Sequence, residues 1–335
     1  MSTYRALQVF KLSTDFRAVT KIVKIPKLPV AKPGHVVVRN HYLGINAIDI
    51  NITNGHFGNH ELPFTCGLEA VGAITAVGND VENFKVGDAV AYQHHGAFAE
   101  YVLVPAAAAL KVPAPEPAML PLMVGGVSCS IALEQAGQMK SGETVLVTSA
   151  AGGTGQFVVQ LAKMAGNHVI GTCSTDEKAE HLKKLGCDRL IVTSKESIDA
   201  VLKAEYPNGV DLVFETVGGE TFKTAVENIA VRGRIIVFGY ISEYKPEGND
   251  ASQPFSVSEL NVKLLMRSAS VRGFGLGGYL SFIPEHLTRL LNYVQEGKLI
   301  PGIDQTPYHG LEEVADAVER MFARKNLGKL VVKLV

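Results

Sequence analysis

Small residues are spaced along residues 144–156 in a pattern that suits the binding of a phosphate group. An apolar run at 144–147 leads into a small-residue segment, and an amphipathic stretch follows at 157–164. Within that segment Ala150, Gly152 and Gly155 reproduce the spacing G-x-G-x-x-G, with alanine at the first position. A strand, turn and helix of this kind bring backbone N–H groups and a helix N-terminus up to a pyrophosphate. A tight turn without a ligand is the alternative interpretation.

The composition favours a protein that acts on small molecules. At 335 residues, 47% of them hydrophobic, the chain exceeds the usual single-core size and predicts two domains. Lys and Arg number 32 against 33 Asp and Glu, with no long run of one charge, so neither nucleic acid nor an anionic membrane is expected as a partner.

No signal peptide is recognisable, and the apolar stretches read as too short to span a bilayer. We therefore expect a cytoplasmic protein, with import into mitochondria or peroxisomes left open. The four cysteines, Cys66, Cys129, Cys173 and Cys187, form no C-x-x-C pair. This spacing argues against a disulfide scaffold or a structural zinc site and fits a reducing compartment.

The hydrophobic pattern changes partway along the chain. The first third predicts short strands at 4–10, 18–23, 34–40, 67–77, 89–92 and 97–104, as in an antiparallel β domain. After a proline-rich stretch ending near 121, strands at 144–149, 168–172, 189–193, 210–215, 233–238 and 269–274 alternate with helices, one more of which is expected at 285–296. A last strand within 328–335 is expected to return to the first domain. The prediction is an α/β protein with a doubly wound parallel sheet, residues 122–300, inserted in a β domain of residues 1–121 and 301–335.

The end of the second predicted parallel strand indicates which nucleotide fits. An acidic residue there holds the ribose 2′-hydroxyl of NAD, whereas this chain has Gly-Thr-Cys-Ser at 171–174. We predict that Ser174 caps the next helix, with Glu177 completing a capping box, and that Ser174 and Lys178 hold a 2′-phosphate. NADP(H) is therefore the expected cofactor. Alternatively, Lys178 is merely balanced by the acidic residues beside it.

Taken together, these motifs resemble the zinc-free quinone-oxidoreductase branch of the medium-chain dehydrogenase/reductases, and within it the 15-oxoprostaglandin 13-reductase group. The resemblance covers nearly the whole chain and rests on residues 44–49, 150–157, 168–178, 184–189, 209–211 and 325–329. It implies a GroES-like first domain, a Rossmann second domain, a cleft between them and a homodimer. It also implies that NADPH reduces the activated carbon–carbon double bond of an enone or quinone.

The resemblance also bears on metal binding. Zinc-bearing relatives read Gly-His-Glu where this chain has Gly-Leu-Glu at 67–69, and they carry a four-cysteine lobe that is missing here. Leucine cannot bind a metal, and a catalytic zinc needs three protein ligands. The adjacent pair His94 and His95 is interpreted as part of a solvated loop. No metal is expected.

The resemblance implies functions for single residues. Asn46 and Tyr244 are the candidate catalytic groups, because amide and phenol donors can stabilise the charge that develops on a substrate carbonyl. Phe57, Tyr240 and Phe274 are expected to line the substrate pocket. For Asn46 the alternative is a turn cap, and for the others it is ordinary packing. The implied cofactor contacts are Asn46, Ser128, Thr148, Ala151, Gly152, Gly153, Thr154, Gly155, Ser174, Lys178, Ser194, Gly239, Tyr240, Phe274 and Asn326.

Two departures from the family pattern affect these expectations. Phe57 stands where relatives have a tyrosine that is a candidate proton donor, so the identity of the general acid is open. Ser194 replaces a tyrosine thought to help hold the 2′-phosphate, which weakens the expected preference for NADPH.

Three functions follow from these observations. The first is NADPH-dependent enone reduction on oxo-lipids such as 15-oxoprostaglandins, and the second is quinone reduction of broad scope. The third, which the missing hydroxyl at Phe57 keeps open, is a nucleotide-binding structural protein with little turnover. The lipid substrate depends on an apolar environment expected from Phe57, Phe255, Leu276, Leu280 and Phe282.

Overall fold

The computed structural model describes residues 3–58, 60–244 and 256–335, which form two compact units. The first unit consists of Met1–Val124 and Ile303–Val335, and the second consists of Gly125–Gly302. The chain thus leaves the first unit and returns to it after completing the second.

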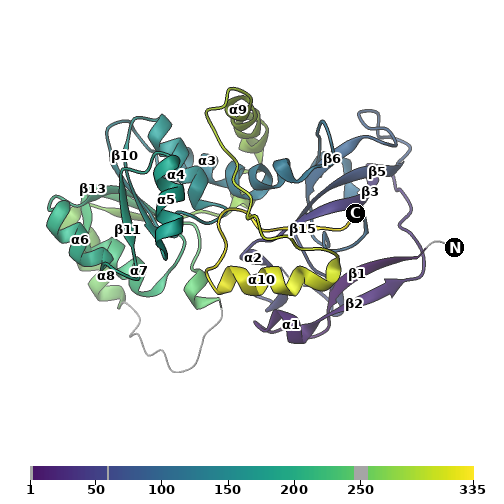
Figure 1. Ribbon diagram of the computed structural model, residues 1–335, viewed down its shortest axis with the longest axis horizontal. Helices are drawn as coiled ribbons and strands as arrows, with labels where there is room; N and C mark the ends of the chain where they lie inside the picture. The colour runs from purple at the N-terminus through teal and green to yellow at the C-terminus, as the bar shows by residue number, and fades with distance from the viewer. Residues whose placement is uncertain (1–2, 59, 245–255) are drawn as a thin grey trace. The chain divides into compact units, whose positions relative to one another are not determined.

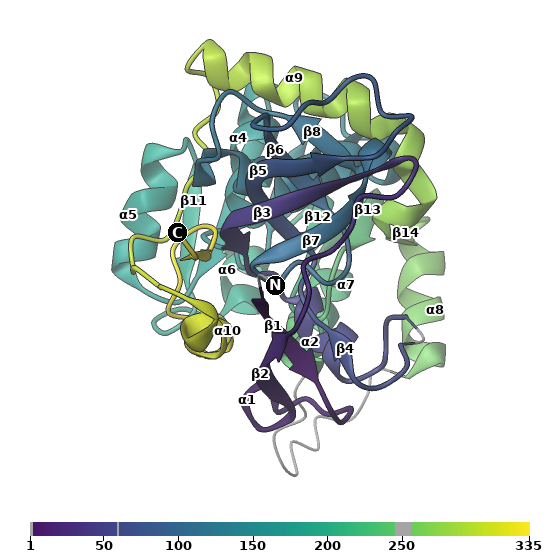
Figure 2. The same cartoon turned by 90° about the vertical axis from the view of Figure 1, so that its right-hand side faces the viewer.

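The first unit is an antiparallel β structure. Strands β1 (Tyr4–Val9), β2 (Thr20–Ile25) and β4 (Phe64–Thr65) form a small sheet with β1 in the centre. A larger sheet has the order β15 (Val331–Lys333), β3 (His35–Gly44), β5 (Glu69–Val77), β6 (Ala89–Gln93) and β8 (Ala109–Lys111). Strand β7 (Tyr101–Pro105) also pairs with β3 and lies beside it in Figure 2. The last strand therefore belongs to the first unit, as the sequence predicts.

Short helices interrupt this β unit. They are α1 (Phe16–Val19), α2 (Ile48–Thr53) and, near the C-terminus, α10 (Val314–Phe322). The sequence analysis predicts only strands in the first third of the chain, and α1 and α2 differ from that expectation. Both are shorter than two turns and are held mainly by tertiary packing, for which hydrophobic periodicity gives little signal.

The second unit is a six-stranded parallel sheet with helices packed against it (Figure 1). Its order is β11 (Arg189–Val192), β10 (His168–Cys173), β9 (Thr144–Val147), β12 (Val210–Glu215), β13 (Ile229–Val237) and β14 (Ser270–Gly273). The order reverses between β9 and β12, which is the arrangement of a Rossmann fold. The fold is therefore a GroES-like antiparallel sheet and a Rossmann sheet, and the predicted strands of the second domain are confirmed.

Helices α4 (Gly155–Met164) and α5 (Asp176–Lys184) pack on β9, β10 and β11. Helices α7 (Gly219–Glu227) and α8 (Val257–Arg267) pack on β12 and β13, and α6 (Ile198–Glu205), α3 (Val127–Ile131) and α9 (Ile283–Gln295) complete the unit. The core between these layers is aliphatic, with Leu146, Ile170 and Val213 among its fully buried residues.

The helical stretch Pro117–Ala136 differs from the expectation about membrane spans. It is 20 residues long and apolar enough, by length and composition, to cross a bilayer. In this protein 72% of its most apolar window is buried, and the core helix of a soluble protein meets the same criterion.

Candidate functional site

Four polar residues of the first unit meet where three strands lie side by side. Asn46 lies between β3 and α2, Asp49 lies in the first turn of α2, Glu69 begins β5, and Lys329 precedes β15. In the sheet register Gly44, the last residue of β3, pairs with Glu69 on one side and with Val331 on the other. Strand pairing thus brings together groups that are far apart in the sequence. We call these four residues the Asn46 cluster.

Hydrogen bonds fix the side chain of Asn46 within this cluster. Lys329 Nζ donates to Asn46 Oδ1 at 2.7 Å, and Asn46 Nδ2 donates to Glu69 Oε1 at 2.9 Å. Lys329 and Glu69 also form an ion pair, and the backbone N–H of Asn46 donates to Asp49 Oδ2 at 2.8 Å. The predicted catalytic amide is therefore held in one orientation.

Three members of the cluster are sequestered from water, while Asn46 is partly exposed. Glu69 and Asp49 have no exposed surface and Lys329 is 4% exposed. Burial raises the pKa of the Asp49 carboxyl to about 7, an effect that the Asn46 hydrogen bond and the charge of Lys329 only partly offset. Sequence reasoning missed Asp49, Glu69 and Lys329 as a group. The signal in the sequence that could have identified the group is Glu69, a carboxylate at the start of an apolar strand.

The expected aromatic and apolar substrate contacts are distributed over both units. Phe57, in the first unit, is 44% exposed, and Leu280, in the second, is 60% exposed. Leu276 and Phe282 are partly buried, and Phe255 lies outside the described residues. Apolar side chains exposed to this extent are available to a hydrophobic ligand.

In the second unit, the turn between β9 and α4 has the close packing that a nucleotide-binding turn requires. A Cβ at Gly155 would lie 2.6 Å from Ala150 Cα, and a Cβ at Gly152 would lie 3.3 Å from Ser149 O. The positive φ of the turn, 49°, occurs at Ser149, so Ala150 can replace the first glycine of the motif without strain. Residues 151–154 therefore present a glycine-rich backbone at the N-terminus of α4, which fits a pyrophosphate.

Thr148, another predicted cofactor contact, is fully buried below this turn. Its hydroxyl lies 3.3 Å from Phe214 O, from Glu215 Oε1 and from Thr216 Oγ1. Glu215 is also fully buried, accepts hydrogen bonds from the backbone of Val217 and Gly218, and has a pKa raised by burial. Both lie where the strand order reverses. Sequence reasoning did not identify Glu215.

The residues predicted to hold a 2′-phosphate follow two adjacent strand ends. Cys173 at the end of β10 pairs with Val192 at the end of β11, so Ser174 and Ser194 emerge from neighbouring strands. Lys178 lies on α5, which follows β10. No carboxylate lies at positions 172–175, which leaves the strand end open to an anion.

The predicted helix cap at this end is wrong by one residue. Helix α5 begins at Asp176, and Thr175 is its N-cap, with its hydroxyl accepting from the Lys178 backbone N–H at 3.4 Å. Thr175 is extended, with φ −142° and ψ 159°, which is the conformation that a cap adopts. Ser174 is thus free of the capping role assigned to it, and Glu177 completes no capping box. Lys195, which the sequence analysis passed over, pairs with Asp176 at 2.7 Å.

The other predicted contacts of the second unit follow β13 and β14. Phe274 stacks on Phe238 at 5.5 Å and on Tyr279 at 5.1 Å between ring centroids. The Tyr240 ring meets the Tyr244 ring edge-on at 4.6 Å. Tyr244 is 8% exposed, and a Cβ added at Gly239 would lie 3.3 Å from its hydroxyl, so this phenol packs closely over the end of β13.

Two further predicted contacts lie apart from these groups. Ser128, on α3, is 3% exposed. Asn326 belongs to the first unit, and its Nδ2 donates to Gly328 O at 3.1 Å. This bond shapes the turn that leads to Lys329.

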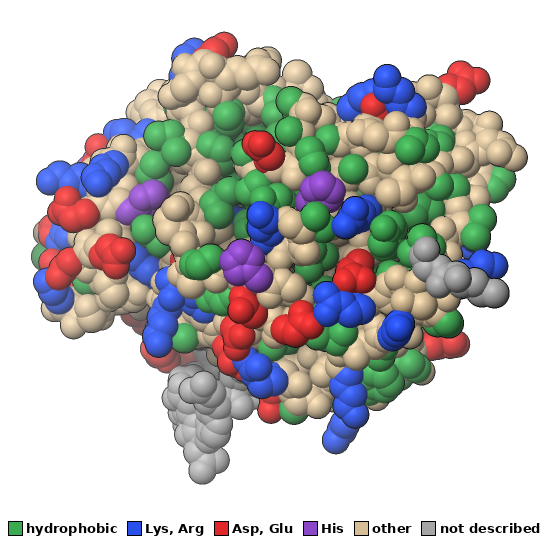
Figure 3. Space-filling view, turned by 45° about the vertical axis from the view of Figure 1, so that its right-hand side comes forward, with side chains coloured by type: hydrophobic (Ala, Val, Ile, Leu, Met, Phe, Trp, Pro, Cys, Tyr) green, Lys and Arg blue, Asp and Glu red, His purple; other side chains and the backbone are tan. Residues whose placement is uncertain are grey.

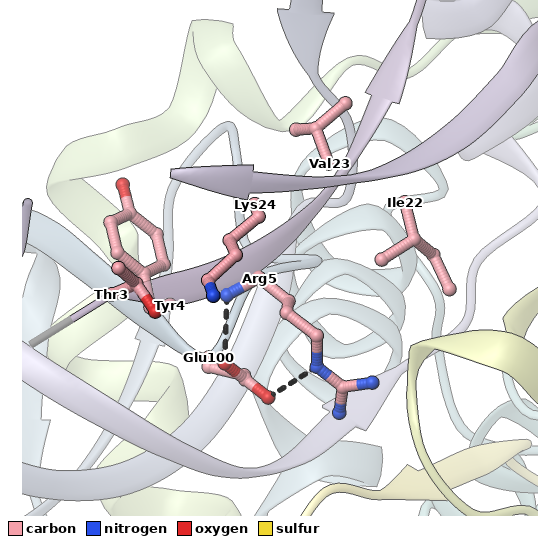
Figure 4. A pocket seen from close by; sticks show the side chains of 7 residues that line it. All are labelled: Thr3, Tyr4, Arg5, Ile22, Val23, Lys24 and Glu100. Atoms are coloured by element: carbon pink, nitrogen blue, oxygen red, sulfur yellow. Dashed lines mark hydrogen bonds and ion pairs between the residues drawn. The ribbon is translucent and has the colours of Figure 1, made fainter. Parts of the chain in front are cut away.

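One hollow in the first unit is not built from predicted site residues. It measures about 480 Å³ and is lined by β1 and β2 with Glu100 (Figure 4). Glu100 accepts from the Arg5 backbone N–H at 2.7 Å and from Arg5 Nε at 2.8 Å. Because these polar groups bind one another, we do not associate this hollow with the function.

Within residues 3–58, 60–244 and 256–335, no group of three or more His, Cys, Asp and Glu side chains could hold a metal ion. Acidic and basic side chains are interspersed on the face in Figure 3.

Comparison with known proteins identifies relatives over the whole length. Residues 32–114 match the family "Alcohol dehydrogenase GroES-like domain", and residues 153–294 match "Zinc-binding dehydrogenase". The chain is 44% identical to "Prostaglandin reductase-3" of Mus musculus, with 99% of this chain and 90% of the relative covered. It is 43% identical to "Probable quinone oxidoreductase" of Leishmania amazonensis, with coverages of 99% and 98%.

Solved structures show the same architecture. A quinone oxidoreductase of Escherichia coli, solved as a complex with NADPH, superposes with a TM-score of 0.83 at 26% identity. The match covers 98% of this chain and 99% of that one.

Proposed function

Because this chain belongs to the medium-chain dehydrogenase/reductase family, in its branch of quinone oxidoreductases and prostaglandin reductases, we propose that it is an NADPH-dependent enone reductase. The proposed substrates are oxo-lipids of the 15-oxoprostaglandin type. The observation that supports this most strongly is 44% identity to a prostaglandin reductase over nearly the whole chain.

The second unit supports the choice of cofactor. Its turn at residues 150–155 packs tightly because Gly155 and Gly152 lack side chains, and this packing sets the N-terminus of α4 beside the proposed pyrophosphate position. Ser174, Lys178 and Ser194 offer hydroxyl and ammonium donors to a 2′-phosphate at the ends of β10 and β11. When bound, NADPH supplies the hydride.

The chain's own residues then have three tasks. Asn46, in the first unit, is the proposed donor of a hydrogen bond to the carbonyl oxygen on which negative charge develops, and Tyr244, in the second unit, is a separate candidate for the same task. Phe57 in the first unit, and Tyr240 and Phe274 in the second, are each proposed to offer apolar surface to the substrate. Because Phe57 has no hydroxyl, the proton that completes the reduction comes from Tyr244, from a cofactor ribose hydroxyl or from water.

We further propose that the reaction needs no metal. Leu68 cannot act as a ligand, and the sequence offers no cysteine lobe. Activity should therefore persist after dialysis against a chelator, and elemental analysis should find less than about one zinc ion in ten chains. Stoichiometric zinc, or activity lost to the chelator and restored by zinc, would overturn this part.

A homodimer is also proposed. Helix α8 exposes Val257, Val262, Leu265 and Met266 at 74%, 58%, 78% and 75% of their surface. In addition, β14 is an edge strand of the parallel sheet that the described residues form. Apolar surface and an open sheet edge are both features that association covers.

A substrate test distinguishes the proposed functions. The purified protein is mixed with NADPH and 15-oxoprostaglandin, and the product is followed by absorbance at the nicotinamide band and by mass spectrometry. We expect equal consumption of both reactants and a product heavier by two hydrogens. Turnover with quinones alone would favour a quinone reductase, which the name of the Leishmania relative suggests. Binding of NADPH without turnover on either substrate would favour a structural role.

A further inference from the structure

The Asn46 cluster contains two charged residues to which neither the sequence pattern nor the relatives assign a role. We propose that Lys329 and Glu69 form a positioning pair that fixes the amide of Asn46 for reaction. This inference rests on the proposed function, because it makes Asn46 the group that meets the substrate or the nicotinamide.

The chemistry of the two partners determines which way the amide faces. Lysine is only a donor, so the atom of Asn46 nearest Lys329 Nζ, at 2.7 Å, must be the oxygen. An ionised glutamate is only an acceptor, so the atom 2.9 Å from Glu69 Oε1 must be the nitrogen. A rotation of the amide by 180° would set donor against donor and acceptor against acceptor. The pair thus selects one of the two orientations.

The surroundings hold the pair itself in place. Glu69 is fully buried and Lys329 is 4% exposed, so neither side chain exchanges its partner for water. A Cβ at Gly44 would collide with the Glu69 carboxylate, so the glycine at the end of β3 leaves the room that the carboxylate occupies. Asp49 fixes the backbone of Asn46 through the 2.8 Å bond to its N–H. Backbone and side chain are thus restrained independently.

Asn46 Nδ2 donates to Glu69 Oε1 at 2.9 Å and, at the longer distance of 3.4 Å, to Gly44 O. The longer bond is the weaker one, so this N–H is the donor that a ligand can take over. The charge of Lys329 on the amide oxygen polarises the group and strengthens that donor. A buried ion pair is not needed for stability, since apolar residues of similar volume often serve as well. In this proposal the role of the pair is therefore to orient Asn46.

The test is a double-mutant cycle. Lys329→Met alone leaves the Glu69 carboxylate buried without its counter-ion and can prevent folding, so both residues are replaced together, as Lys329→Met/Glu69→Leu. The same pair of changes is made in an Asn46→Ala background. Denaturant unfolding, NADPH affinity and kcat/KM for enone reduction are measured for all four proteins.

We expect the double variant to fold and to lose at least about tenfold in kcat/KM, since small misplacements of a reacting group are costly. In the Asn46→Ala background the same change should alter kcat/KM by less than about twofold, because the group being positioned is gone. An unchanged kcat/KM in the double variant, or an equal loss in both backgrounds, would overturn the proposal.

A second measurement does not depend on turnover. The side-chain amide signals of Asn46 in ¹⁵N–¹H spectra are identified by their absence in Asn46→Ala. We expect two separate, slowly exchanging protons in the unaltered protein, and faster hydrogen exchange in the double variant. Fast exchange in the unaltered protein would overturn the positioning role. If the unaltered protein instead shows slow exchange but reduces no enone, the proposed function fails while the positioning of Asn46 stands.

Discussion

Asp49 is a carboxyl group without access to water, and its titration should be visible in the stability of the protein. Burial raises its pKa from 3.8 to about 7. Between these two pH values the folded protein keeps a proton on Asp49 that the unfolded chain has released. Stability from this residue is therefore present at acidic pH and is lost as the pH rises from about 4 to 7.

The change Asp49→Asn should remove this dependence. Asparagine can still accept from the Asn46 N–H but carries no charge, so the variant should be more stable than the unaltered protein at pH 8 by about 1 to 3 kcal/mol. The difference should shrink towards pH 5. Denaturant unfolding at several pH values measures it, and a difference independent of pH would contradict the pKa argument.

Lys178 should contribute to the choice between NADPH and NADH. Replacing it by glutamate sets a negative charge beside the proposed 2′-phosphate position, and we expect NADPH affinity to fall by at least about tenfold while NADH affinity changes little. Lys184→Glu, at the other end of α5, is the matched control. Titration followed by cofactor fluorescence measures both affinities. Equal losses for the two nucleotides would remove Lys178 from the phosphate site.

Tyr244 should affect the rate more than binding. Its hydroxyl is close to the position of a Gly239 side chain, and Tyr244 itself is only 8% exposed. Tyr244→Phe keeps the ring and its contact with Tyr240, so we expect kcat to fall by about ten- to a hundredfold with little change in NADPH affinity. Tyr240→Phe serves as the comparison. An unchanged kcat for Tyr244→Phe would exclude the phenol from the mechanism.

At the scale of elements, the junction of β9 and α4 depends on the absence of a side chain. A Cβ at Gly155 would be 2.6 Å from Ala150 Cα and 2.7 Å from Ala150 O, and backbone cannot move aside as a side chain does. Gly155→Ala should therefore cost about 1 to 3 kcal/mol of stability and weaken NADPH binding. At Gly277 an added Cβ meets nothing within 4 Å, so Gly277→Ala should leave stability nearly unchanged. Thermal unfolding with and without NADPH compares the two variants.

The elements that the sequence predicts well are those whose own residues carry the signal. Strands β9 and β10 are continuous apolar runs. The start of α4 at Gly155 is predictable because the small residues of the preceding turn have a distinctive spacing. The sequence places the N-cap of α5 at the wrong residue because serine and threonine are both good N-cap residues, and Ser174 and Thr175 are adjacent. Only the backbone conformation, which is extended at Thr175, decides between them. The hydrogen bond between Lys329 and Asn46 joins residues that are 283 positions apart in the sequence. No local sequence pattern predicts a contact at this separation.

At the scale of the whole molecule, the exposed apolar side chains of α8 predict self-association. Leu265→Glu/Met266→Glu places two charges on this surface, where both side chains are more than 70% exposed, so the fold should tolerate them. We expect the unaltered protein to elute with the mass of a dimer in light-scattering chromatography and the variant to shift to the monomer. Lys263→Glu, on the same helix, controls for charge alone. A dimer that withstands the double change would place the interface elsewhere.

Because β15 returns to the first unit, the two units can be completed only in a fixed order while the chain is synthesised. The Rossmann unit is one continuous segment and has all its strands once residue 302 has left the ribosome. The GroES-like unit, although it is begun first, must wait for its final edge strand, which pairs with β3 only when Val331–Lys333 emerge. Until Lys329 arrives, Glu69 lacks its counter-charge. The earliest segment of the nascent chain is therefore among the last to reach its native state.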